Sequence, residues 1–143
     1  MTNDTAEITT TVVPEHRRLK FLPEHFGRQM LRVEMRVFAY AGHAIPGYRG
    51  GFWEFIECSN GAGYLRLQQD GQQPTEWRGL PDGIADPAER VSLTPDAAGL
   101  ALTVLAVNHS LTEDTPSLCE EWERLMEVVY QHPEHPALLS ILD

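Results

Sequence analysis

The HPEHP segment near the carboxyl end carries the residue types that could bind a metal. His132 and His135 lie three positions apart with Glu134 between them, and imidazole and carboxylate groups are zinc ligands. Two imidazoles do not complete a zinc site, which takes three or four protein ligands, and the prolines break the helix that would hold both rings on one face. We therefore favour an exposed connection between helices here. A small metal-binding hydrolase that uses His132, His135 and a distant carboxylate is the alternative.

The other groups that could act as a nucleophile or a base stand alone. Cys58 lies at the end of a predicted strand without a base beside it, and cysteine is commonly a small core residue. Cys58 and Cys119 are expected to be free thiols. His25 and His43 flank the first predicted helix, where capping or surface roles are commoner than catalysis. Loops of the GxxxxGKS/T and GxGxxG types and a GxSxG elbow are missing from the sequence. We predict no catalytic residue, no metal and no cofactor.

An apolar stripe predicts an N-terminal helix after VVPEHRRLKFLPEHFG. The stripe has alternating spacings of four and three residues and consists of Phe26, Met30, Val33, Val37 and Tyr40. These spacings place all five side chains on one helical face. Three arginines, Arg28, Arg32 and Arg36, lie on another face. The helix should end near Gly42, before the loop AGHAIPGYRGG.

A β-hairpin is predicted in the middle of the chain. FWEFIEC and YLRLQQ are rich in aromatic or branched residues and are separated by SNGAG, in which Asn60 and Gly61 tolerate positive φ. Both faces of the first strand carry large apolar groups, so each face should be at least partly covered. Core packing is the favoured role of Trp53 and Phe55, and an interface is the alternative. TEWRGL is a plausible third strand and ERVSL a possible fourth.

Helices are predicted for the carboxyl-terminal third. Thr94-Pro95-Asp96 is typical of a helix start, and AAGLALTVLAVNHSL is apolar nearly all round, as in a core helix. A long helix should run from about Ser117 to His132-Pro133, followed by a short turn or helix in HPALLSILD. The predicted fold class is α+β: a small antiparallel β-meander of three to four strands, packed with an N-terminal helix and a C-terminal group of helices. We expect a disordered N-terminus over residues 1–12 and a single domain over residues 13–143.

Net charge limits the partners that the chain can bind. The 143 residues carry a formal charge of −10, which argues against strong nucleic-acid binding. No apolar run reaches the roughly 20 residues of a membrane span, so we expect a cytoplasmic protein that has no membrane contact. The charge is uneven: residues 15–49 hold seven basic and three acidic residues, whereas residues 112–143 hold eight acids and one arginine. Solvated helix faces of opposite sign are favoured over a dedicated electrostatic surface.

Four segments resemble, in order, the signature blocks of a known family. They are VPEHRRLKFLPEHFG, YRGGFWEFIECSNGAG, DAAGLALTVLAVN and HPEHPALLSILD. They resemble blocks of the KlcA/ArdB antirestriction proteins, which plasmids and other mobile elements carry, and the similarity runs from about residue 13 to residue 143. FLPxHFG and GGxWEFxxxSNG are the most unusual blocks. Residues 68–93 match weakly, and Phe52 stands where the family pattern has tyrosine.

The resemblance implies a non-enzymatic protein that relieves the restriction of incoming DNA by host type I restriction-modification systems. The implied partner is the type I enzyme or an associated host factor, contacted directly or indirectly, and we expect a monomer. Motif positions that are candidates for binding, or for a structural role in the hairpin, are His25, Trp53, Glu54, Phe55, Ser59, Asn60, Gly61 and the terminal Asp143. Imitation of DNA phosphates by Glu120, Glu123 and Glu127 ranks below a specific protein contact. A generic adaptor that binds proteins through the sheet edge is a further alternative.

Overall fold

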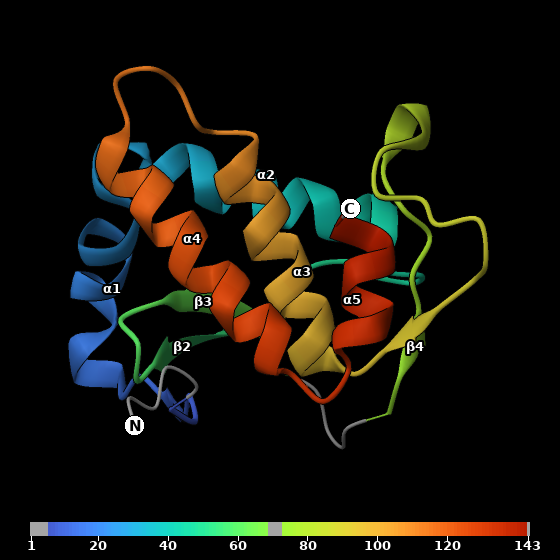
Figure 1. Cartoon of the computed structure of the whole chain (residues 1–143), viewed down its shortest axis with the longest axis horizontal. Helices are drawn as coiled ribbons and strands as arrows, with labels where there is room; N and C mark the ends of the chain where they lie inside the picture. The colour runs from blue at the N-terminus through green and yellow to red at the C-terminus, as the bar shows by residue number, and fades with distance from the viewer. Residues whose placement is uncertain (1–5, 69–72, 143) are drawn as a thin grey trace.

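The computed structural model describes residues 6–68 and 73–142, and its fold is of the predicted α+β class (Figure 1). The strands are β1 (Thr10–Val12), β2 (Trp53–Cys58), β3 (Gly63–Leu67), β4 (Thr75–Glu76) and β5 (Ser92–Leu93). The α-helices are α1 (Arg18–Phe26), α2 (Met30–Ala44), α3 (Pro95–Asn108), α4 (Pro116–Gln131) and α5 (His135–Leu142). Short 3-10 helices are η1 (Glu15–Arg17), η2 (Gly27–Gln29) and η3 (Pro81–Gly83).

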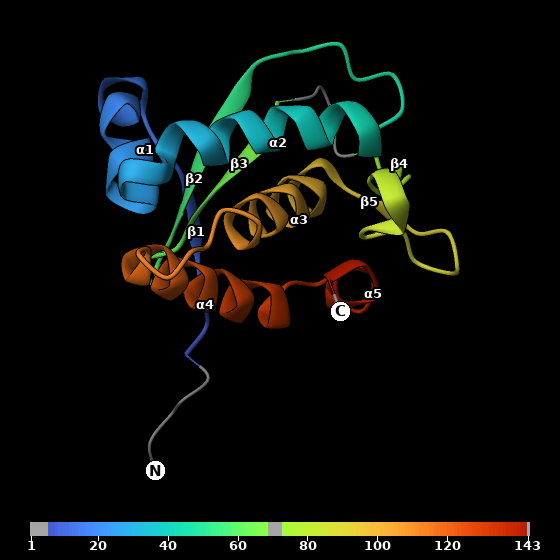
Figure 2. The same cartoon turned by 90° about the horizontal axis from the view of Figure 1, so that it is seen from above.

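Helix α3 is the central element of the fold. Figure 2 shows it between α2 on one side and α4 on the other, and it also packs against β3 and α5. Its residues are apolar on every side and are buried from Ala97 to Val107, because neighbours cover the helix all round. Thr94 caps the helix by accepting a hydrogen bond from the Ala97 N–H at 3.3 Å, and Pro95 occupies the first turn. The sequence correctly predicts the Thr94 cap, the proline in the first turn and the burial of this helix in the core.

The main sheet contains β1, β2 and β3 in that order, with antiparallel pairing throughout. The β2–β3 hairpin is the predicted one. Its turn depends on Gly61, whose φ is 93°, whereas Asn60 does not take the positive φ that we expect of it. Both faces of β2 are covered: Trp53 and Phe55 are buried on one face and Ile56 on the other. The hairpin therefore forms part of the core.

Strand β1 falls within the segment predicted to be disordered. Thr10 pairs with Cys58 and Val12 with Ile56, so residues 10–12 are ordered by their partner β2. The prediction is wrong for these three residues, since TTV is too short to show a strand pattern without its partner. The first five residues lie outside the described part of the chain.

The outer edge of β3 is closed by side chains from two helices. In this register the N–H groups of Gly63 and Leu65 point away from β2. Glu121 of α4 accepts from the Gly63 N–H at 2.7 Å, and the Thr103 hydroxyl of α3 accepts from the Leu65 N–H at 3.1 Å. Thr103 in turn donates to the Gly99 carbonyl at 2.9 Å. A further strand therefore has no free edge of β3 to join.

This closure explains a difference from the sequence-based prediction. We expect TEWRGL and ERVSL to extend the meander, but Thr75–Glu76 pairs with Ser92–Leu93 in a separate two-stranded sheet. Trp77, which follows β4, is buried, and its indole N–H donates to the Ala85 carbonyl at 2.8 Å. The segment from β4 to β5 therefore forms a separate small sheet and does not extend the main one.

The N-terminal helical region begins earlier than predicted. FLPEHF belongs to α1 although Pro23 lies inside the helix, and the chain turns at Gly27, whose φ is 56°, before α2 begins. The predicted stripe is confirmed from Met30 onward, with Val33 and Val37 fully buried. α1 escapes the prediction because it is short and carries a proline, which is a helix-breaking signal in sequence.

None of the helices in residues 6–68 and 73–142 combines the length and the apolar character that crossing a membrane requires.

Replacing Gly99 with alanine should destabilise the protein by about 3 kcal/mol, because α3 approaches the backbone of β3 at this residue. An added Cβ would lie 2.3 Å from the Leu65 carbonyl oxygen and 2.8 Å from the Arg66 Cα. Urea denaturation measures the change. The matched control is Gly42→Ala in α2, where a Cβ meets nothing within 4 Å and we expect a gain of about 0.5–1 kcal/mol. Equal effects of the two substitutions would contradict the close packing of α3 on β3.

Candidate functional site

A buried polar cluster lies where α1, α4 and the β2–β3 hairpin meet. We call it the His25 cluster, and it contains His25, Glu57, Glu121, Arg124 and the backbone N–H of Gly63. The Glu121 side chain is 1% exposed, accepts from Gly63 and binds the Arg124 guanidinium at 2.8 Å. A buried carboxylate is stable only with such partners. Glu121 therefore connects α4 to the sheet.

His25 lies between two carboxylates. Its Nδ1 is 3.3 Å from Glu121 and its Nε2 is 3.2 Å from Glu57, and its side chain is 9% exposed. Burial by itself lowers the pKa of His25, but the hydrogen bonds and charges of Glu121 and then Glu57 outweigh it, so the pKa is raised above 6.5. Both ring nitrogens can donate when the ring is protonated. The imidazole also packs against Gly63, where a Cβ would lie 2.8 Å from ring atoms.

Hydrogen bonds connect the Ser59-Asn60-Gly61 turn of the hairpin to the start of β1 and to α4. Ser59 Oγ accepts from the Thr9 N–H at 2.9 Å, which holds the start of β1. Asn60 Nδ2 donates to the Arg124 carbonyl at 3.0 Å and to Glu127 at 3.1 Å. Gly61 lies against the Arg124 side chain. These motif residues therefore sit beside the His25 cluster and hold the turn on α4.

Three further motif candidates lie on β2. Trp53 is buried and donates from its indole N–H to the Tyr48 hydroxyl at 3.2 Å. Phe55 stacks on Phe21 with ring centroids 4.7 Å apart. Glu54 accepts from Arg66 at 3.1 Å. Asp143, the remaining motif candidate, lies outside the described residues.

A second polar group lies around Asp96 at the start of α3. We call it the Asp96 cluster, and it contains Asp96, Tyr64, Arg66 and His132. Asp96 accepts from the Tyr64 hydroxyl at 2.7 Å and from Arg66 and His132 at 2.9 Å each. Burial alone raises the pKa of Asp96, but the hydrogen bonds from His132, Tyr64 and Arg66 outweigh it and lower the pKa to about 2. The cluster borders a cavity of about 270 Å³ that Glu134 also lines.

The structure separates the two histidines of HPEHP. His132 faces Asp96 through Nε2, and its Nδ1 accepts from the Glu134 N–H at 3.0 Å. His135 lies outside this pair, with Nδ1 3.0 Å from the His132 carbonyl. Within residues 6–68 and 73–142, no three His, Cys, Asp or Glu side chains are grouped as metal ligands would be. His132 therefore joins α4 to α3.

The environment of Cys58 does not favour the reactive thiolate form. Its side chain is buried, and that burial, reinforced by the charges of Glu121, Asp96 and Glu57, raises the pKa of the thiol to about 12. A thiol with this pKa is protonated at neutral pH, whereas the thiolate is the reactive form. Its role is core packing.

Comparison with known proteins decides the family. The family model described as "Antirestriction protein" matches residues 46–143, which include the β2–β3 hairpin and helices α3, α4 and α5. This chain belongs to the antirestriction protein family. It is 35% identical over 144 residues to the antirestriction protein KlcA of Escherichia coli, with 95% of this chain and 94% of KlcA covered. It is 33% identical to the uncharacterized protein YfjX of Escherichia coli K12, with 96% and 89% covered.

A solved structure extends the likeness to the fold. It is a structure of the KlcA and ArdB proteins, it covers 100% of both chains, and it has a TM-score of 0.78 at 28% identity. Those proteins have a novel fold and antirestriction activity against type I DNA restriction systems in vivo but not in vitro. The family resemblance drawn from the signature blocks is confirmed.

Glu121 is the important residue of this antirestriction protein that sequence reasoning missed. The sequence does contain a signal for it, because Glu121 follows Leu118 by three positions and precedes Leu125 by four, and both leucines are buried. A carboxylate at that spacing lies on the inner face of the helix. Its partners His25 and Gly63 are far away in sequence, so the pairing itself has no local signature.

His25 should make stability depend on pH. Because the pKa of His25 is raised above 6.5 in the folded protein, its contribution to stability is fully present below pH 6.5 and is lost as the pH rises through the folded-state pKa. We expect the difference in free energy of unfolding between wild type and His25→Gln to shrink over this range. Urea denaturation from about pH 6 to about pH 9 measures it. The exposed His16 supplies the control substitution, His16→Gln. A difference that stays constant with pH would contradict the ion pairs of His25.

Replacing His132 with alanine should destabilise the protein by about 1–3 kcal/mol, because Asp96 loses a charge-assisted partner and the Glu134 N–H loses its acceptor. The control is His135→Ala, which removes an exposed ring from the same segment and should have little effect. Thermal or urea unfolding measures both variants, and metal analysis of the purified proteins accompanies it. Stoichiometric zinc in the wild type that is lost in the His132→Ala variant would contradict this assignment and favour a metal site.

Proposed function

We propose that this protein relieves the restriction of incoming DNA by type I restriction-modification systems and that it does so without catalysing a reaction. The observation that carries the proposal is the likeness to KlcA and ArdB over the whole chain, with a TM-score of 0.78. Family membership, which rests on residues 46–143 and on relatives that are at least 30% identical, supports the same conclusion. The proposed place of action is the cytoplasm, where incoming DNA meets the restriction enzyme.

The geometry of the titratable groups supports a non-catalytic role. A general base or nucleophile needs a free lone pair directed at a substrate. In the described residues, His25 is held between two carboxylates, His132 is bonded at both ring nitrogens, and Cys58 is a buried thiol. The two histidines are held by contacts that connect secondary-structure elements, and the thiol is shielded from solvent. This arrangement suits a protein that acts through its surface.

Contact with a protein is favoured over imitation of DNA. Glu120, Glu123 and Glu127 are exposed on α4, but Glu127 already accepts a hydrogen bond from Asn60 at 3.1 Å. B-DNA carries one negative charge per about 1.7 Å of axis, and a single row of three carboxylates does not reproduce a duplex. The activity of KlcA and ArdB in vivo but not in vitro agrees with a partner that cells supply. We propose that this partner is the type I enzyme in its cellular state or a host factor associated with it.

Expression of the protein should raise the plating efficiency of unmodified phage on cells that carry a type I restriction system. We expect the efficiency to approach that of the matched strain without the system. The assay compares expressing and non-expressing cells of both strains across several type I specificities. Immunoblotting of the soluble fraction confirms that the protein is present.

Unchanged plating despite soluble expression would refute the proposed function. It would shift support to a protein-binding module of the same fold. A separate titration of purified type I enzyme with this protein tests DNA mimicry: binding that competes with DNA and weakens steeply with salt would reverse the preference stated above.

A further inference from the structure

The outward side of α2 exposes apolar residues that the fold does not use. Leu31 is 63% exposed and Met35 is 69% exposed, one helical turn apart on the same face. Ala39 and Gly42 continue the exposed row along the helix. Figure 2 shows α2 on the side of α3 opposite α4, and the exposure of Leu31 and Met35 shows that this face of α2 meets solvent. The opposite face of α2, which contains Val33 and Val37, is buried in the core.

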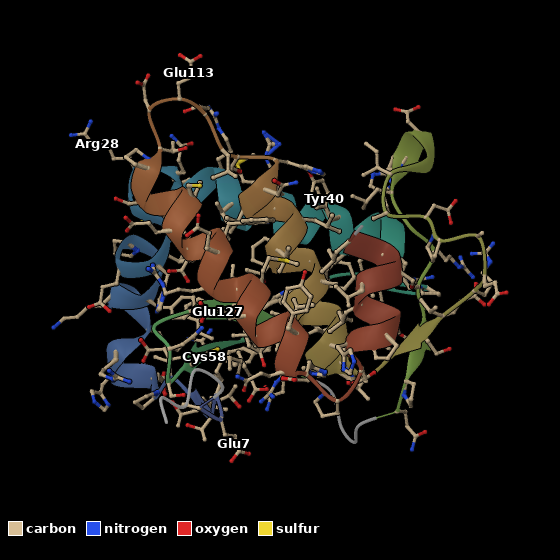
Figure 3. All side chains as sticks on the ribbon, in the orientation of Figure 1. Glu7, Arg28, Tyr40, Cys58, Glu113 and Glu127 are labelled. Carbon is tan, nitrogen blue, oxygen red and sulfur yellow. The ribbon has the colours of Figure 1, made fainter. Side chains whose placement is uncertain are left out.

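Arginines flank one side of this apolar row, and the half-buried Glu34 lies on the other side. The other exposed residues of segment 28–44, all of it described, are Arg28, Arg32 and His43, and none of the exposed residues there is acidic. Figure 3 shows Arg28 pointing away from the body of the molecule. A shallow depression of about 530 Å³ is lined by Arg28, Gln29, Leu31, Arg32, Met35 and Arg36. Arg36, which lines this depression, donates a hydrogen bond from its Nε to the Ser110 hydroxyl at 3.1 Å.

These features together have the composition of a protein interface. Met and Arg are enriched in interface cores and Lys and Glu are depleted, and an apolar centre with a charged rim is the usual anatomy. A surface for nucleic acid needs phosphate contacts but not exposed Leu and Met side chains. In a chain of net charge −10, a cationic face attracts an acidic partner while the remaining surface repels it. The charge therefore also selects the orientation of approach.

We infer that the outward face of α2, comprising Arg28, Leu31, Arg32 and Met35, is the docking surface for an acidic protein surface with an apolar centre. The inference rests on the proposed function, since the docked protein is the partner through which restriction is relieved. A second copy of the chain fits less well. Its acidic α4 lies on the side opposite α2 (Figure 2), so such contacts would be head-to-tail and would not close a dimer.

The plating assay tests this surface through two variants. Arg28→Glu with Arg32→Glu reverses the charge, and Leu31→Ser with Met35→Ser removes the apolar centre. The matched control is Arg78→Glu with Arg90→Glu, which changes the net charge equally at exposed arginines near β4. We expect both α2 variants to lose relief of restriction and the control to keep it. Circular dichroism and urea unfolding confirm that all three variants are folded.

The outcomes separate the inference from the proposed function. Full relief by both folded α2 variants overturns the inference and leaves the proposed function standing, whereas no relief by the wild type overturns both. Two purified-protein measurements complete the test. Binding of a DNA duplex that the arginine variant abolishes would overturn the inference in favour of nucleic acid. A dimer that the Leu31/Met35 variant dissolves would overturn it in favour of self-association.

A binding measurement with purified type I enzyme identifies which protein carries the acidic surface. Binding of wild-type protein to the enzyme that Arg28→Glu with Arg32→Glu weakens supports the inference and identifies the enzyme as the partner. Lack of binding, combined with α2-dependent plating, also supports it and identifies a host factor.

Discussion

The buried carboxylate of Glu121 is the interaction on which the arrangement of this fold depends. A sheet of three strands leaves N–H groups unpaired along its edge, and buried N–H groups require acceptors. Glu121 supplies the acceptor for Gly63, and its own charge then requires the cations Arg124 and His25. One polar requirement thus brings α1, α4 and the hairpin to a single point. Removal of either cation would leave the buried carboxylate only partly compensated, and uncompensated buried charge is among the costliest changes in a protein interior.

The unusual sequence blocks of the family lie far apart in the chain but meet at α4 in the fold. The histidine of FLPxHFG and the turn of GGxWEFxxxSNG both pack around α4, one through Glu121 and the other through the Arg124 carbonyl. Their aromatic side chains Phe21, Phe26, Trp53 and Phe55 are buried in the core. The blocks therefore fix the shape of the molecule, whereas α2 offers its exposed residues to solvent.

Elements with strong local patterns were predictable from sequence. The apolar helix α3 with its Thr94 cap, the glycine turn at Gly61 and the buried stripe of α2 all follow from spacing and residue type. β1 was not predictable, because three residues become a strand only through their pairing with β2. The separate position of β4 depends on Thr103 and Glu121 occupying the edge of β3, which no local pattern reports. Of the candidate site, His25 and Asn60 were found through motifs, but the partners that give them their roles are distant in sequence.

The closed edge of β3 also affects the behaviour of the protein at high concentration. Open sheet edges are templates on which further chains add strands and begin to aggregate. Here α3 and α4 cover one edge of the main sheet, and the other edge is β1, which is three residues long. A strand of that length offers an incoming chain few backbone hydrogen bonds. The main sheet therefore gives freshly made copies of the chain little opportunity for edge-to-edge association, even where many of them are close together.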